Sequence, residues 1–314
     1  MTGLDTVRAW KSTAIPIGLG GSVFGWIVDP ADTDPILDRF FELGGRFIDT
    51  SDGYSHAARP TGADSESLIG SWVRRRGVAN EIRIITKVGL CPGVEGLAPA
   101  VVAEAVTASL DRLGVCTVEA VLAHADDRRT PPADIAAGFA ALVGSRARHI
   151  GVSRFSPDRL HATQAALRQT STTEFTVVEE EFSLADRDGS TTAAGQGLGL
   201  VCSAGLARGF LTGKFQYAVT RVGARHRYVD EHYSTPAHHA LLAGLRVVAA
   251  EHGVSPAAVA IRWLLEHETV VLPLVSVTNP GQLEVFGEVA ALRLTAEQWA
   301  TLEALSAALP TAAR

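Results

Sequence analysis

The chain alternates short runs of β-branched and aliphatic residues with longer segments that have helical periodicity. We predict eight strands, at residues 15–19, 47–50, 82–88, 118–124, 149–153, 176–182, 198–203 and 270–275. Strands that alternate with helices form a parallel sheet, because each helix returns the chain to the edge where the next strand begins. Eight such units close into a (β/α)8 TIM barrel, and 314 residues suit that size. We therefore predict an α/β protein with one barrel domain over residues 1–314.

Helix-start signals separate the predicted strands. The pairs Asp34-Pro35, Ser156-Pro157 and Ser255-Pro256 each predict an N-cap followed by the first helical residue. One unit departs from this pattern, because only 15 residues lie between Phe182 and Leu198. We expect the helix of that unit to be shortened or lost.

An open doubly wound sheet is the rival architecture for such an alternation. Its cofactor-binding form carries the pattern G-x-G-x-x-G where the first helix begins. Gly18, Gly20 and Gly21 lie at the end of the first predicted strand and just after it, but they do not have that spacing. The barrel is therefore the better interpretation.

Charge and cysteine usage narrow the classes of function. The formal net charge is −6 and no basic block occurs, which disfavours binding to nucleic acid or to an anionic membrane. The three cysteines form no C-x-x-C pair, and the sequence shows neither a secretion signal nor an apolar run of membrane-spanning length. We expect a cytoplasmic protein, and the abundance of alanine and arginine suggests a bacterial origin.

Four residues with acid–base chemistry fall at one end of the predicted barrel. Asp49, Lys87 and His124 lie at the ends of three consecutive strands, and Tyr54 follows the first of these strands. The chain has only three lysines, so abundance does not account for Lys87. Active sites of (β/α)8 barrels lie at the carboxyl ends of the strands, so we expect the four side chains to meet.

These four side chains suit proton transfer to or from a carbonyl or alcohol oxygen. A free tyrosine has a pKa of about 10, and a nearby ammonium group lowers this pKa by favouring the phenolate. A carboxylate holds the ammonium group in place, and a neutral histidine can donate a hydrogen bond to a carbonyl oxygen. Each residue alone also has a structural explanation, as part of a rim ion pair, a packed core or a surface loop. Their joint arrangement favours catalysis.

Six segments resemble the aldo-keto reductase family in order and spacing. They are RFIDTSDGY at 46–54, ITKV at 85–88, LAHAD at 122–126, RHIGVSRFSP at 148–157, RGFLTGK at 208–214 and SPAAVAIRWLL at 255–265. The resemblance implies that Tyr54 is the general acid and that Lys87 lowers its pKa. It also implies that Asp49 is the partner of Lys87 and that His124 orients the substrate carbonyl.

The resemblance further implies a nicotinamide cofactor, NADPH or else NADH, lying across the barrel mouth. The positions expected to contact it are Gly21, Ser153, Arg154, Glu179, Ser203, Ala204, Leu206, Arg208, Ser276, Thr278 and Gln282. The expected substrate is a small carbonyl compound or a sugar-like one.

The cofactor side departs from the family pattern at four places. Arg154 replaces an asparagine and Glu179 replaces a glutamine, the two amides that hold the nicotinamide carboxamide. These two substitutes could pair with each other. Ser203 replaces a tyrosine that stacks on the nicotinamide ring, and no basic residue stands near Thr278 for an adenosine phosphate. Arg221, Arg225 or Arg227 could reach that phosphate instead.

The departures keep two other functions open. One is a lyase, dehydratase or isomerase that applies the same four residues to a hydroxycarbonyl compound without a cofactor. The other is a non-catalytic binding or regulatory subunit. A polar stretch at about 215–236 is predicted as a surface loop, either a lid over the cofactor or a plain connection. His226, His232, His238 and His239 lack the pattern of a metal site, and we predict none. The sequence carries no signal for an oligomeric state.

Overall fold

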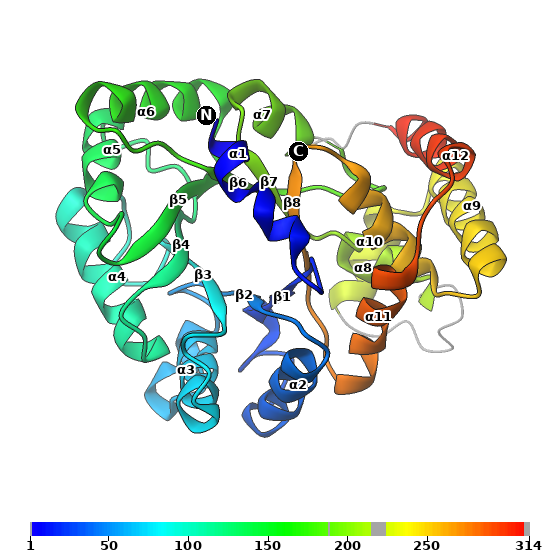
Figure 1. Ribbon diagram of the computed structural model, residues 1–314, viewed down its shortest axis with the longest axis horizontal. Coiled ribbons are helices and arrows are strands. Elements are labelled where there is room, and N and C mark those ends of the chain that lie inside the picture. The colour runs from blue at the N-terminus through cyan, green and yellow to red at the C-terminus, as the bar shows by residue number, and fades with distance from the viewer. Residues whose placement is uncertain (1, 188, 215–223, 311–314) are drawn as a thin grey trace.

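The computed structural model describes residues 2–187, 189–214 and 224–310, and it contains a closed barrel of eight parallel strands (Figure 1). Each strand pairs with its neighbours in the chain, and β1 also pairs with β8. The strands are β1 (Gly18–Gly20), β2 (Phe47–Asp49), β3 (Arg83–Val88), β4 (Val118–Ala123), β5 (Ala147–Ser153), β6 (Val177–Glu181), β7 (Gly199–Ser203) and β8 (Val270–Val275). The predicted (β/α)8 architecture is confirmed.

Helices surround the strands and cover the outer face of the barrel (Figure 1). The first six units carry α2 (Pro30–Glu42), α3 (Ser65–Arg76), α4 (Pro99–Leu113), α5 (Pro132–Ala140), α6 (Pro157–Thr170) and α7 (Gly189–Gln196). Strand β7 is followed by a 3-10 segment at Ala207–Thr212, then by α8 (Ala224–His232), α9 (Pro236–His252) and α10 (Pro256–Glu266). Beyond β8 come a 3-10 turn at Pro280–Leu283, α11 (Glu284–Ala291) and α12 (Ala296–Ala307), which packs beside α9.

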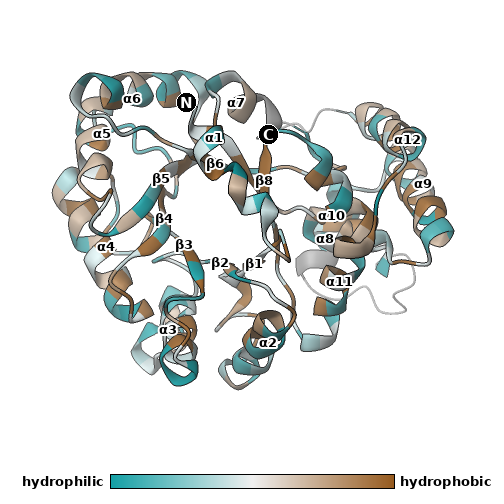
Figure 2. Ribbon diagram, viewed as in Figure 1, coloured by the Kyte–Doolittle hydropathy of each residue, from teal (hydrophilic) through white to brown (hydrophobic). Residues whose placement is uncertain are grey.

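Hydrophobic side chains fill two layers. One lies between the strands and the helices, and a smaller one lies inside the barrel around Phe47, Ile85 and Leu122. Figure 2 shows hydrophobic residues along β8 and hydrophilic residues on the outer turns of α3. In the described part of the chain, no helix is both long enough and apolar enough to cross a membrane.

Two local predictions need correction, and a third is confirmed. Helix α2 begins at Pro30 and not at Pro35, because Asp29-Pro30 offers the same start signal earlier and the later proline is tolerated inside the helix. Helix α7 has only eight residues, as the short spacing predicted. The stretch predicted as a surface loop contains α8, because Val229 and the following Tyr233 are buried. Residues 215–223 of that stretch lie outside the described residues.

The floor of the barrel is closed by an N-terminal segment that the periodicity did not predict. It consists of α1 (Gly3–Val7) and a 3-10 turn at Arg8–Ser12, both too short to show a helical repeat. Trp10 packs on the ring of Phe47 at 5.1 Å and donates a hydrogen bond from Nε1 to Glu119 Oε1 at 3.0 Å.

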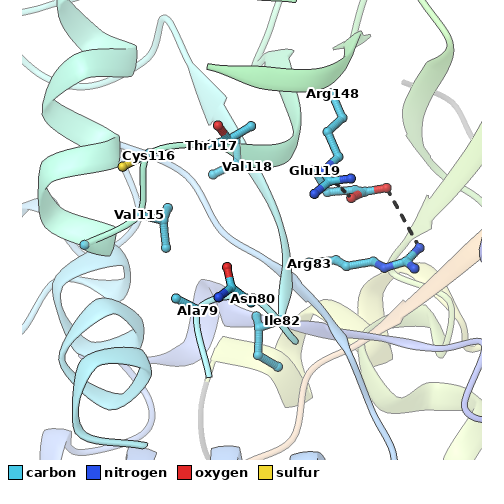
Figure 3. A pocket seen from close by; sticks show the side chains of 11 residues that line it. Ala79, Asn80, Ile82, Arg83, Val115, Cys116, Thr117, Val118, Glu119 and Arg148 are labelled. Atoms are coloured by element: carbon cyan, nitrogen blue, oxygen red, sulfur yellow. Dashed lines mark ion pairs between the residues drawn. The ribbon is translucent and has the colours of Figure 1, made fainter. Parts of the chain in front are cut away.

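A hollow of about 520 Å³ lies beside this floor, at the amino-terminal ends of β3, β4 and β5 (Figure 3). Glu119 Oε1 lies 4.0 Å from Arg83 NH1, and Glu119 Oε2 lies 3.7 Å from Arg148 Nε. The floor of a (β/α)8 barrel serves stability, so we assign this ion cluster to the closure of the barrel.

Candidate active site

The period of two along each strand explains which side chains enter the barrel mouth. Phe47, Ile85, Leu122, Val177 and Val201 all belong to the inner hydrophobic layer. In a strand, residues two positions apart share one face. The positions two residues further on are therefore directed into the barrel above that layer, and they are Asp49, Lys87, His124, Glu179 and Ser203. The polar mouth follows from the apolar core beneath it.

Lys87 lies at the centre of this mouth and is 1% exposed. Its ammonium group donates to Asp49 Oδ1, to the carbonyl oxygen of Thr50 at 3.2 Å and to Tyr54 Oη at 3.4 Å. The structure thus brings together the lysine, the aspartate and the tyrosine that the sequence singled out. The Thr50 carbonyl is an additional partner that side-chain motifs do not reveal.

His124 completes the cluster. Its ring lies edge-on to the Tyr54 ring, with 5.5 Å between the centroids. Burial, together with the charges of Lys87 and Arg154, lowers the pKa of His124 to about 3, so the imidazole is neutral near pH 7. Its Nδ1 lies 3.0 Å from the hydroxyl oxygen of Ser51, which accepts a hydrogen bond from the backbone of Gly53. Ser51 stands two residues after Asp49, and this spacing was the one signal that could have identified it.

The pKa of Tyr54 lies above its ordinary value. Burial is the largest cause, Lys87 opposes it, and Asp49 and Glu179 add to it. For Lys87, burial acts to lower the pKa, but Asp49 and Glu179 outweigh burial and raise it. The ammonium is therefore charged, and its pull on the phenol is partly cancelled by the two carboxyl groups.

Glu179 contradicts the expected pairing with Arg154. Its Oε2 lies 3.1 Å from Lys87 Nζ, whereas Arg154 is exposed and its backbone N–H donates to Glu180 Oε1 at 2.9 Å. The reason is geometric, because Glu179 is directed into the barrel while Arg154 follows the end of β5 with a φ of 54°. Burial and the charge of Glu179 raise the pKa of Asp49 to about 8.

Backbone strain is concentrated around the mouth. Within the described residues, five non-glycine residues have a positive φ, and all five lie in loops after β2, β5 and β7: Ser55, Arg154, Ala204, Ala207 and Arg208. Strained backbone of this kind collects at ligand sites, and alternating right- and left-handed residues make anion-binding cradles of N–H groups. The β7 loop is therefore a candidate anion-binding loop. Its Arg208 pairs with Glu181 at 2.6 Å.

The remaining expected cofactor positions lie around the same mouth. Ser153 is buried, while Ser203, Ala204 and Leu206 are half-buried. Gly21 has a packing role, because a Cβ there would lie 2.7 Å from the carbonyl oxygen of Asp49.

After β8, Ser276 is exposed, and Gln282 Oε1 accepts a hydrogen bond from the backbone of Thr278 at 2.8 Å. Arg227 is exposed on α8, whereas Arg221 and the side chain of Arg225 lie outside the described residues. Among the residues that the structure describes, no group of three metal-binding side chains is found.

Comparison with known proteins assigns the family. The model of the aldo/keto reductase family matches residues 16–307. The chain is 29% identical to aldo-keto reductase str7 of Strobilurus tenacellus, over 92% of this chain and 85% of that protein. It is 28% identical to L-glyceraldehyde 3-phosphate reductase of Escherichia coli, over 86% of this chain and 82% of that protein. It is 24% identical to aldo-keto reductase yakc [NADP(+)] of Schizosaccharomyces pombe, over 90% of this chain and 85% of that protein.

The chain therefore belongs to the aldo/keto reductase family. Family membership and the similarity to these reductases together identify it as an NAD(P)H-dependent oxidoreductase.

Proposed function

We propose that the protein reduces an aldehyde or ketone to an alcohol with NADPH, using Asp49, Tyr54, Lys87 and His124. The observation that carries the proposal is the contact of Lys87 Nζ with both Asp49 Oδ1 and Tyr54 Oη in a buried mouth. This contact gives the tyrosine hydroxyl a fixed orientation and a charged neighbour. When bound, the reduced nicotinamide supplies the hydride to the carbonyl carbon.

The chain's own residues handle the carbonyl oxygen. If the Ser51 hydroxyl donates to Nδ1 of His124, the proton of the neutral imidazole is on Nε2. His124 then donates one hydrogen bond to the carbonyl oxygen, and Tyr54 gives that oxygen its proton. Lys87 stabilises the phenolate that remains, and Asp49 keeps Lys87 in place.

The cofactor side of the mouth supports a dinucleotide, but its support for NADPH over NADH is weaker. The strained β7 loop, which follows Ser203 and contains Arg208, would hold the pyrophosphate, and Ser153 ends β5 at the same end of the barrel. One relative carries NADP(+) in its name, which favours NADPH. The charge of Arg208 is shared with Glu181, so NADH is the alternative cofactor.

The substrate class that fits best is a small, polar hydroxyaldehyde or a sugar-like carbonyl compound. One relative is named as a reductase of L-glyceraldehyde 3-phosphate, a short hydroxyaldehyde. Helix α8 is proposed as a lid, since Arg208 of the β7 loop lies 4.5 Å from the ring of Tyr228 on α8. All three cysteines are free thiols, which fits a reducing cytoplasm.

One observation favours a second candidate function. Glu179 contacts Lys87 where an amide would hold the nicotinamide carboxamide, so part of the cofactor clamp is replaced. The same four residues could then catalyse a lyase or isomerase reaction on a hydroxycarbonyl compound without hydride transfer.

Calorimetric titration with NADPH and with NADH, followed by turnover of glyceraldehyde, separates the two candidates. Micromolar binding with turnover that Tyr54→Phe abolishes supports the reductase. If neither binding nor turnover is detected at millimolar cofactor, the reductase proposal is refuted and the cofactor-independent enzyme is favoured.

A further inference from the structure

Glu179 occupies a place in the barrel mouth that the four proposed catalytic residues do not explain. The residue is 4% exposed, and its Oε2 lies 3.1 Å from Lys87 Nζ. The ammonium group already has three acceptors, namely Asp49 Oδ1, the Thr50 carbonyl oxygen and Tyr54 Oη. Glu179 Oε2 is accordingly left without a hydrogen-bond partner among the described residues. A buried oxygen of this kind is costly unless it carries a proton or meets one.

The charges of the cluster do not balance if both carboxyl groups ionise. Asp49 and Glu179 would contribute two negative charges against the single positive charge of Lys87. The other titratable groups that act on this cluster are Tyr54, His124 and the buried thiol of Cys202, with Arg154 acting on His124 from the loop after β5. None of them supplies a second positive charge inside the mouth.

Two like charges in one buried site disfavour each other, and such a pair keeps a proton. Both carboxyl groups contact the same ammonium group, since Lys87 Nζ pairs with Asp49 Oδ1 and with Glu179 Oε2. A proton on one carboxyl group would allow it to donate a hydrogen bond to the other.

We propose that Asp49 and Glu179 form a carboxyl pair that holds one exchangeable proton beside Lys87, and that this pair sets how readily Tyr54 releases its own proton. Glu179 is then a positioning residue that acts through Lys87. The catalytic part of this inference rests on the proposed reductase function, whereas the proton on the pair does not depend on it.

The pair has a consequence for the direction of catalysis. Two carboxyl groups around one ammonium weaken its attraction for a phenolate, so Tyr54 stays protonated over a wide range of pH. A protonated tyrosine can donate to a carbonyl oxygen, but it cannot accept a proton from an alcohol. The site is therefore biased toward carbonyl reduction, and alcohol oxidation should begin only at alkaline pH.

Infrared spectroscopy of the protein without cofactor tests the shared proton. At pH 7 we expect a protonated-carboxyl band that is present in the wild type and lost in Glu179→Gln. Asp52, another buried carboxyl group, contributes its own band, since burial raises its pKa to about 7, and the Glu179 variant should retain that band. The matched control is Glu119→Gln, which removes a buried glutamate at the floor and should keep the band of the pair (Figure 3). A wild-type spectrum identical to that of Glu179→Gln in this region would overturn the proposal.

The pH profile of alcohol oxidation tests the effect on Tyr54. At alkaline pH, once the wild-type pair has lost its shared proton, Glu179→Gln carries one negative charge fewer beside Lys87. The onset of oxidation in the variant should therefore shift to lower pH by about one unit or more. Glu119→Gln should show the wild-type profile. If Glu179→Gln loses the infrared band but its pH profile is not shifted, the positioning role is refuted and the shared proton is not. Absence of turnover in every variant would refute the reductase function, while the infrared result would still decide whether the pair holds a proton.

Discussion

The hydroxyl oxygen of Ser51 lies 3.0 Å from Nδ1 of His124, and this contact determines which nitrogen of the neutral imidazole carries the proton. The same hydroxyl oxygen accepts a hydrogen bond from the backbone N–H of Gly53, and the acceptors for its own proton are Nδ1 of His124 and Asp52 Oδ1 at 3.4 Å. Donation to Nδ1 is the arrangement that the proposed reduction requires. The proton of His124 is then on Nε2, the nitrogen that would meet a substrate oxygen.

Ser51→Ala should therefore lower kcat/KM for carbonyl reduction by about tenfold, the loss expected for one oriented hydrogen bond. Steady-state kinetics at pH 7 measures the effect. Ser109→Ala, which removes a buried hydroxyl on α4, is the control and should leave kcat/KM unchanged. Wild-type kinetics in Ser51→Ala would show that the serine does not fix the imidazole.

Replacing Lys87 with methionine should destabilise the fold in a pH-dependent manner. The change leaves Asp49 and Glu179 buried without a cation, which costs about 3–5 kcal/mol when they are charged. Both carboxyl groups can take up protons in acid, so the loss of unfolding free energy should be smaller at pH 5 than at pH 8. Denaturant unfolding at the two pH values measures it, and an equal loss at both would contradict the assigned ion cluster.

Restoring the two family amides should tighten cofactor binding. In Arg154→Asn with Glu179→Gln, two amide side chains become available to the nicotinamide carboxamide, and we expect an about tenfold lower Kd for NADPH by calorimetry. Asparagine also tolerates the positive φ of position 154 better than arginine does. The two single variants show how much each amide contributes to the gain. Weaker binding in the double variant would mean that the native Arg154 and Glu179 themselves contact the cofactor.

The sequence was sufficient to predict the barrel and the four clustered residues. The barrel, Asp49, Lys87 and His124 depend on strand periodicity, and Tyr54 follows Asp49 closely in the chain. The rule that directs Asp49 and Lys87 into the mouth also applies to Glu179, but the partner predicted for Glu179 was wrong. The orientation of Arg154 depends on a backbone φ that no pattern of residue types specifies. Short elements such as α1 escaped prediction for a related reason, since one turn of helix shows no repeat.

Gly21→Ala should disturb the backbone position of Asp49. The added Cβ would lie 2.7 Å from the Asp49 carbonyl oxygen and 2.9 Å from Ser65 Oγ, so the backbone must shift. Overpacking of this kind costs about 1–3 kcal/mol of stability. The control is Gly287→Ala on α11, where a Cβ meets nothing within 4 Å and better helix propensity should add up to about 1 kcal/mol. Denaturant unfolding compares the two, and equal stability would contradict the close packing at Gly21.

The pKa of His124, lowered to about 3, predicts an unusual acid side of the pH–rate profile. The neutral imidazole persists in the folded protein well below pH 6, so kcat/KM for reduction should show no histidine titration near pH 6.5. The same shift affects stability. The unfolded chain protonates this histidine below about pH 6.5 and the folded chain does not, so its contribution to the unfolding free energy falls as pH drops from 6.5 toward 3. His124→Gln should remove that dependence, and denaturant unfolding of both proteins between pH 4 and 7 would measure the difference. A difference that stays constant with pH would show that His124 titrates normally and is not held neutral by the mouth.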